Sequence, residues 1–159
     1  MKITVLAVGK VKERFYREAI AEYTKRLGRY CRLEIVEVSD EKTPDGAAPA
    51  MERQIKEKEG ERILSHVREG SYVVALALEG METDSPGLAE RIETWSVSGV
   101  NQLVFIIGGS LGLSDSVLSR ADFKLSFSKL TFPHQLMRVL VLEQLYRSYR
   151  IIHKQPYHK

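Results

Sequence analysis

Short apolar runs alternate with amphipathic segments along most of this chain, and this alternation restricts the possible folds more than any other feature. The runs are rich in β-branched residues and cover Ile3–Val8, Leu33–Val38, Tyr72–Leu78 and Gln102–Ile107. Such runs are typical of strands in a buried sheet, with the second nearer an edge because two glutamates interrupt it. Strands that alternate with helices predict an α/β fold with a mostly parallel sheet and helices on both faces.

The segments between these runs have helical spacing. In the first, apolar residues recur every four positions and predict an inward face made of Val11, Phe15, Ala19, Tyr23 and Leu27. The second, 51–67, places Met51 and Ile55 inward and leaves its many charged residues as a solvated surface. The third is expected to begin with Ser85 as its N-cap and Pro86 at the first helical position.

The length and the charge of the chain limit its class. A chain of 159 residues with 43% apolar and 28% charged residues is expected to form one domain, residues 1–159. The net charge of +3 permits an anionic partner without requiring one. Cys31 is the single cysteine, which fits a reducing compartment and no structural metal. With neither a signal peptide nor a membrane span in view, a cytoplasmic protein is predicted.

A glycine-rich turn, Gly108–Gly112, directly follows the fourth expected strand. Ligands of parallel α/β sheets bind beyond the carboxyl ends of the strands, where glycines let a ligand approach the backbone closely. The spacing matches neither the dinucleotide fingerprint nor a Walker A loop. A ligand loop and a simple tight turn therefore both fit this segment.

The stretch Leu125–Arg138 concentrates polar groups at a predicted helix start. A brief strand is followed by the turn Ser128–Thr131, and Thr131 or Phe132 is expected to cap a helix with Pro133 in its first turn. His134 and Arg138 are four residues apart and so share one helix face. Free N–H groups at a helix start favour an anion or a carboxylate. This stretch is the predicted centre of a functional site.

The last helical segment, 136–152, carries too many apolar residues for a single stripe. In a chain of this size, a second copy of the protein is the simplest way to cover the extra surface, so a homodimer is expected. The alternative is that this is the central core helix of a monomer. The tail after it, 155–159, has the composition of a frayed terminus.

The sequence closely resembles, from end to end, the ribosomal large subunit methyltransferase H family, a branch of the SPOUT methyltransferases. The segments that carry the resemblance are Gly9–Lys10, Ala75–Gly80, Phe105–Ser110, Leu125–Arg138 and Pro156–Lys159. The resemblance implies a trefoil-knotted α/β fold, a homodimer and S-adenosylmethionine as methyl donor, without a metal. It also implies methylation of N3 of pseudouridine 1915 in the 23S rRNA of the assembled ribosome.

By the same resemblance, the donor would be bound by residues at three strand ends, namely Leu76, Gly108, Phe127, Ser128, Lys129, Leu130, Thr131 and Phe132. The tail would complete the site, from the same or the partner subunit. The candidate catalytic residues are His158, Tyr157, His134 and Arg138. Of the two histidines, His158 is expected to contribute more, because a histidine at a helix start more often has a structural role. Arg138 and Lys129 are candidates for stabilising negative charge on the base.

One position departs from the family pattern, since Met81-Glu82 stands where a lysine is expected. A cationic contact there is therefore in doubt, and RNA is expected instead to meet basic residues of the first turn and the last helix, at Lys10, Lys12, Arg14, Arg17, Arg147, Arg150 and Lys154. Two other classes of protein fit parts of the sequence. A nucleotide-dependent oxidoreductase would share the sheet and loops, and a non-enzymatic ribosome-binding protein would share the basic surface.

Overall fold

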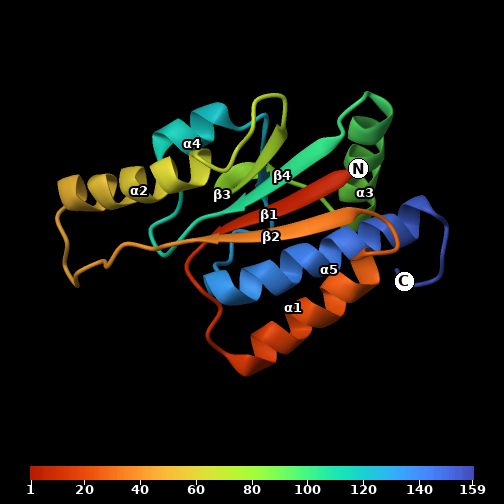
Figure 1. Cartoon of the computed structure of the whole chain (residues 1–159), viewed down its shortest axis with the longest axis horizontal. Helices are drawn as coiled ribbons and strands as arrows, with labels where there is room; N and C mark the ends of the chain where they lie inside the picture. The colour runs from red at the N-terminus through yellow and green to blue at the C-terminus, as the bar shows by residue number, and fades with distance from the viewer.

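A five-stranded parallel sheet forms the centre of the computed structural model, which describes all residues from Met1 to Lys159 (Figure 1). Its strands are β1 (Lys2–Val8), β2 (Arg32–Val38), β3 (Tyr72–Glu82), β4 (Gln102–Ile107) and β5 (Phe123–Ser126). Their order across the sheet is β2-β1-β4-β3-β5, and every neighbouring pair is parallel. The predicted α/β fold with a parallel sheet is confirmed, and β2 lies at an edge as expected.

Helices cover both faces of the sheet (Figure 1). The helices are α1 (Arg14–Leu27), α2 (Pro49–Leu64), α3 (Ser85–Val97), α4 (Asp115–Arg120) and α5 (His134–Ile152). On one face α5 packs against both α1 and α3, and on the other face α2 packs against α4. None of these helices is long and apolar enough to span a membrane.

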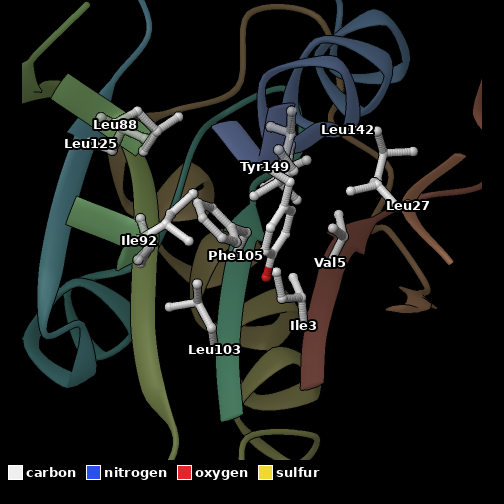
Figure 2. Packing of buried hydrophobic residues seen from close by; sticks show 14 of the residues in the cluster. Ile3, Val5, Leu27, Leu88, Ile92, Leu103, Phe105, Leu125, Leu142 and Tyr149 are labelled. Atoms are coloured by element: carbon white, nitrogen blue, oxygen red, sulfur yellow. The ribbon is translucent and has the colours of Figure 1, made fainter. Parts of the chain in front are cut away.

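Two hydrophobic cores follow from the alternation of side chains along each strand. In β1, Ile3 and Val5 point to the face covered by α5, whereas Leu6 points to the face covered by α2. Figure 2 shows the first core, where Tyr149 and Leu142 of α5 meet residues of β1 and β4. Residues of β1 and β4 are buried in both cores, which explains why the strands are apolar at nearly every position.

The structure corrects several sequence-based boundaries and faces. Phe15 and Met51, both expected inside, are 61% and 46% exposed. A spacing of four residues drifts by about 40° per step on a helix, so Phe15 and Leu27 lie about 120° apart and cannot share one narrow face. Asp84, and not Ser85, caps α3, because its carboxylate accepts a hydrogen bond from the Gly87 N–H.

The start of α5 also differs from the prediction. Pro133 is the N-cap and the helix begins at His134, so neither Thr131 nor Phe132 caps it. Proline suits this position because its fixed φ fits the helix entry and it has no N–H to leave unpaired. The short helix α4, held by the Ser114 side chain that accepts from the Val117 N–H, has no counterpart in the sequence-based prediction.

Strand β3 runs past its expected end at Leu78 and stays paired with the end of β5. Leu125 is paired both with Leu76 and with Met81, so the chain between those two bulges away from the sheet and then returns to it. A Cβ atom on Gly80 would lie 2.8 Å from the Leu125 backbone, and only glycine avoids this clash because it has no Cβ. The knot that the resemblance implies stays a prediction.

Candidate functional site

Three loops meet at the carboxyl ends of β3, β4 and β5 and line a pocket of about 890 Å³. The loops are Ala77–Glu79 within β3, Gly108–Gly112 after β4 and Phe127–Pro133 after β5. This is the edge where parallel sheets bind their ligands, and the volume lies in the usual range for small-molecule sites. Both loops that the sequence analysis singled out therefore belong to one pocket.

The glycine loop has a tightly folded backbone. Gly112 has a φ of 89° and donates its N–H to the Gly109 carbonyl (3.1 Å), while a Cβ on Gly108 would lie 2.9 Å from the Gly112 carbonyl carbon. Below the loop lies the buried Glu59 of α2, whose carboxylate accepts a hydrogen bond from the Glu41 N–H (3.0 Å). Burial raises the pKa of Glu59. The glycine loop therefore packs against the Glu59 side chain of α2.

The loop after β5 is shaped by its own serines. Ser126 Oγ donates to the Ser128 carbonyl (3.1 Å), and Ser128 Oγ accepts from the Leu130 N–H (2.9 Å). Phe127 packs against the first core, whereas Leu130 stands 71% exposed at the pocket. A loop with internal hydrogen bonds keeps its backbone groups in place for a ligand.

The residues expected to bind the donor are, with one exception, brought together at this pocket: Leu76, Gly108, Phe127, Ser128, Leu130, Thr131 and Phe132 line it. Lys129 is exposed and does not line it. Three charged residues that the sequence did not point to also line the pocket, namely Lys56 of α2, Glu79 and Asp115. Only the Ser114-Asp115-Ser116 helix-start pattern offered a sequence signal for any of them.

His134 lies on the pocket wall at the start of α5. Its Nε2 would be 3.7 Å from a Cβ atom on Gly9, so the imidazole sits over the turn that ends β1. Burial lowers the pKa of His134, and the positive charge of Arg138 lowers it further, against a smaller opposing effect of Asp40. The imidazole is therefore neutral near pH 7 and able to accept a proton.

Arg138 faces the same turn but makes no part of the pocket. It is 1% exposed, and its guanidinium donates to Glu37 Oε2 (2.6 Å) and to the carbonyls of Val8 and Gly9 (both 2.8 Å). Burial lowers the pKa of Arg138, and Glu37 opposes that effect. The structure thus places Arg138 as a clamp between α5 and the end of β1. It does not bring this candidate to the expected position beside a substrate base.

The C-terminal tail does not fray but lies on α5. The Tyr157 hydroxyl donates to Glu143 Oε1 (3.1 Å), and its ring meets Tyr146 edge-on at 4.9 Å. Burial and the charge of Glu143 raise the pKa of Tyr157 to about 12, so it is a hydrogen-bond donor at neutral pH and not a base. His158 Nδ1 is 3.0 Å from Arg147 Nη1, and Nη2 of the same guanidinium is paired with Glu143 Oε1 (2.6 Å).

His158 lines a second, smaller hollow of about 480 Å³. This hollow shares Leu125, Ser126 and Phe127 with the main pocket and extends to the start of α3 and to Gln144. His134 and His158 therefore belong to two hollows that meet at Phe127 and its neighbours. No signal in the sequence placed Gln144 or Ser85 here, yet Ser85 Oγ donates to Gln144 Oε1 (2.8 Å) beside His158.

Comparison with known proteins gives concordant results. A family model described as a predicted SPOUT methyltransferase matches residues 1–158. A "Ribosomal RNA large subunit methyltransferase H" from Bifidobacterium adolescentis is 60% identical, and one from Bifidobacterium animalis subsp. lactis is 58% identical, both over the full length of each chain. A "Ribosomal RNA large subunit methyltransferase H 1" from Clostridium perfringens is 55% identical, again over both full lengths.

Among solved structures, a probable methylase family protein from Haemophilus influenzae Rd KW20 superimposes with a TM-score of 0.55. The match covers 99% of this chain and 70% of that chain, at 14% sequence identity. At this identity the likeness concerns the fold alone.

Proposed function

This chain belongs to the SPOUT methyltransferase family and is a methyltransferase, and we propose that it methylates N3 of pseudouridine 1915 in 23S rRNA with S-adenosylmethionine as donor. The observation that carries the proposal is the pocket formed by the glycine loop and the loop after β5. Full-length relatives at 55–60% identity named for large-subunit rRNA methylation support the choice of substrate.

The residues of the pocket fit the chemical groups of S-adenosylmethionine. Leu76, Phe127 and Leu130 offer apolar surface for an adenine ring, and the loop backbones offer polar groups for its edges. The carboxylates of Glu79 and Asp115 are opposite in charge to the ammonium and sulfonium groups of S-adenosylmethionine, and the ammonium of Lys56 is opposite in charge to its carboxylate. When bound, the donor supplies an electrophilic methyl group.

Protein groups must then handle a proton, because N3 of the base is an imide nitrogen and a poor nucleophile until its proton leaves. His134 lines the main pocket and His158 lines the smaller hollow, and the half-buried His134 is held neutral. Glu143, through Arg147 and Tyr157, fixes the tail that carries His158. We assign the proton to one of these histidines and give Arg138 a positioning role, since both of its Nη groups donate to Glu37 and the end of β1 and it does not line the pocket.

We also propose a homodimer formed through α5. Leu136, Val139 and Leu140 are only partly buried and belong to neither core, so this side of the helix has no partner within the chain. Light scattering is expected to give twice the 18.1 kDa chain mass and a Leu140→Glu variant to give the monomer mass. A wild-type monomer would refute the proposal.

Calorimetric titration distinguishes this function from the alternatives. We expect S-adenosylmethionine to bind and NAD to give no heat, because the glycine loop lacks the dinucleotide spacing. Binding of NAD alone would favour an oxidoreductase. Binding of neither would favour a ribosome-binding protein without activity. A ribosomal substrate also implies that the protein acts in the cytoplasm.

A further inference from the structure

The C-terminal tail, residues 154–159, turns back along α5 at a fixed point. Lys154 has a φ of 54°, and it is the only residue other than glycine with a positive φ. Directly after this turn, the Gln155 N–H donates to the Arg150 carbonyl (2.8 Å). A left-handed residue outside glycine is uncommon and persists where neighbouring contacts hold it. The contacts that hold this turn come from outside the tail.

Three side chains, Tyr30, Arg150 and Gln155, form what we call the tail anchor. The Tyr30 hydroxyl donates to Gln155 Oε1, and Arg150 Nη1 donates to both the Tyr30 oxygen and Gln155 Oε1 (3.1 Å each). Arg150 Nη2 donates to the Pro156 carbonyl (2.9 Å). The Gln155 side-chain oxygen and the Pro156 carbonyl oxygen therefore both accept hydrogen bonds from the body of the protein.

Tyr30 is itself held rigidly. It lies between α1 and β2, and its ring stacks on Tyr149 of α5 with centroids 5.4 Å apart and planes within 7°. The Tyr30 ring centroid also lies 6.2 Å from that of Tyr146 and 5.3 Å from that of His153. The anchor therefore connects the tail to a residue 125 positions earlier in the chain. A tail without such a connection would fray, as chain ends usually do.

We propose that Tyr30 and Arg150 are positioning residues that hold the tail on its own subunit's α5, and so set the place of Tyr157 and His158 for methyl transfer. The inference rests on the proposed function, in which His158 belongs to the site. Ordering the tail in advance removes a conformational cost that the enzyme would otherwise meet each time the RNA binds. Neither anchor residue touches the donor pocket or the smaller hollow, so both act through the tail.

The test uses Tyr30→Phe, which removes the hydroxyl but keeps the ring that stacks on Tyr149. We expect the backbone order parameters of Tyr157 and His158 from ¹⁵N relaxation to fall measurably below the rigid value of about 0.85. We expect kcat/KM for ribosomes to fall about fivefold, the usual effect of one lost hydrogen bond. S-adenosylmethionine affinity and Tm are expected to stay at wild-type values.

Changes at the tail itself provide the second arm. Gln155→Leu is expected to reproduce both effects without altering the body of the protein. Gln155→Glu keeps an acceptor oxygen opposite Arg150 and is expected to retain wild-type transfer. Tyr72→Phe is the matched control, because it removes a phenol hydroxyl at the same end of the sheet, where the ring packs on Trp95 and makes no contact with the tail.

The inference is overturned if Tyr30→Phe and Gln155→Leu leave the tail ordered, or if the tail loosens while kcat/KM stays unchanged. Failure of the proposed function gives a different result. Wild-type protein would then not methylate ribosomes at all, and the order parameters of Tyr30→Phe alone would show whether the anchor holds the tail.

Discussion

At the scale of single residues, the helix start of α5 divides two tasks between side chains one turn apart. His134 reaches the pocket wall and stays neutral, whereas Arg138 is buried and uses its donors on Glu37 and on the end of β1. The charge of Arg138 also contributes to the low pKa of His134. The clamp therefore fixes the position of the helix start and helps to set the proton affinity of its histidine.

The two histidines are expected to give different kinetic defects. His158→Ala removes an imidazole from the smaller hollow, so we expect turnover to fall by about 10²-fold or more with unchanged donor affinity, in line with the loss of a general base. His134→Ala removes part of the donor pocket, so donor affinity should fall while turnover changes less. Single-turnover transfer and calorimetry measure the two effects. Unchanged turnover in His158→Ala would contradict the expectation that His158 contributes more to catalysis than His134.

The lowered pKa of His134 also predicts a pH dependence of stability. His134 takes up a proton less readily in the folded state than in the unfolded chain. At a pH above the ordinary imidazole pKa of about 6.5 the histidine is neutral in both states, so it does not lower the free energy of unfolding. As the pH falls through and below that value, the unfolded chain takes up the proton first and stability decreases. Urea unfolding of wild type and His134→Asn between pH 7.5 and about pH 5 should diverge on this basis. Parallel curves would contradict it.

Removal of the Arg138 clamp should destabilise the fold. In Arg138→Met, the Glu37 carboxylate and the carbonyls of Val8 and Gly9 lose their buried donor, which predicts a loss of about 3 kcal/mol in the free energy of unfolding. Chemical denaturation measures this loss. Arg53→Met, on the exposed surface of α2, is the matched control and should change stability by less than about 0.5 kcal/mol. An equally small effect at Arg138 would refute the clamp.

At the scale of elements, the site is built where the bulge of β3 meets the end of β5. The bulge between Leu76 and Met81 brings Glu79 to the pocket and keeps Gly80 against the backbone of Leu125. The loop after β5 begins at Phe127, two residues after Leu125. Its conformation therefore depends on close packing of two backbones and not only on its own hydrogen bonds.

This packing can be tested with alanine at two glycines. Gly80→Ala would place a Cβ 2.8 Å from Leu125 backbone atoms, so β5 must shift and donor affinity should fall about tenfold or more. Gly70→Ala has the strain of a φ of 85° but nothing within 4 Å, so it should lower stability while leaving donor affinity intact. Calorimetry on both variants gives the comparison, and equal donor affinities would contradict the account.

Local patterns in the sequence predicted the elements well and the contacts between them poorly. Runs such as Tyr72–Leu78 reveal buried strands because burial on both faces demands apolar residues throughout. Packing between distant segments buries Glu59, brings Glu37 to Arg138 and places Lys56 at the pocket. No local sequence pattern predicts such contacts. The tail showed the same limit, since its order comes from Tyr30 and α5.

At the scale of the whole molecule, the chain combines the proposed donor pocket at one edge of the sheet with a modest net charge of +3. Such a charge provides little of the phosphate attraction that binds RNA without regard to shape. Recognition should therefore depend on the folded surface of the assembled ribosome. The proposed dimer through α5 would add a second tail and a second set of basic residues to that surface.

The most direct test of the proposed function is methyl transfer from labelled S-adenosylmethionine to ribosomes that lack the modification, with the product mapped by mass spectrometry. Assembled ribosomes that contain pseudouridine at position 1915 should receive one methyl group at N3 of that base. Naked 23S rRNA and ribosomes with uridine at that position should receive far less. Equal methylation of all three, or no methylation of the first, would contradict the account.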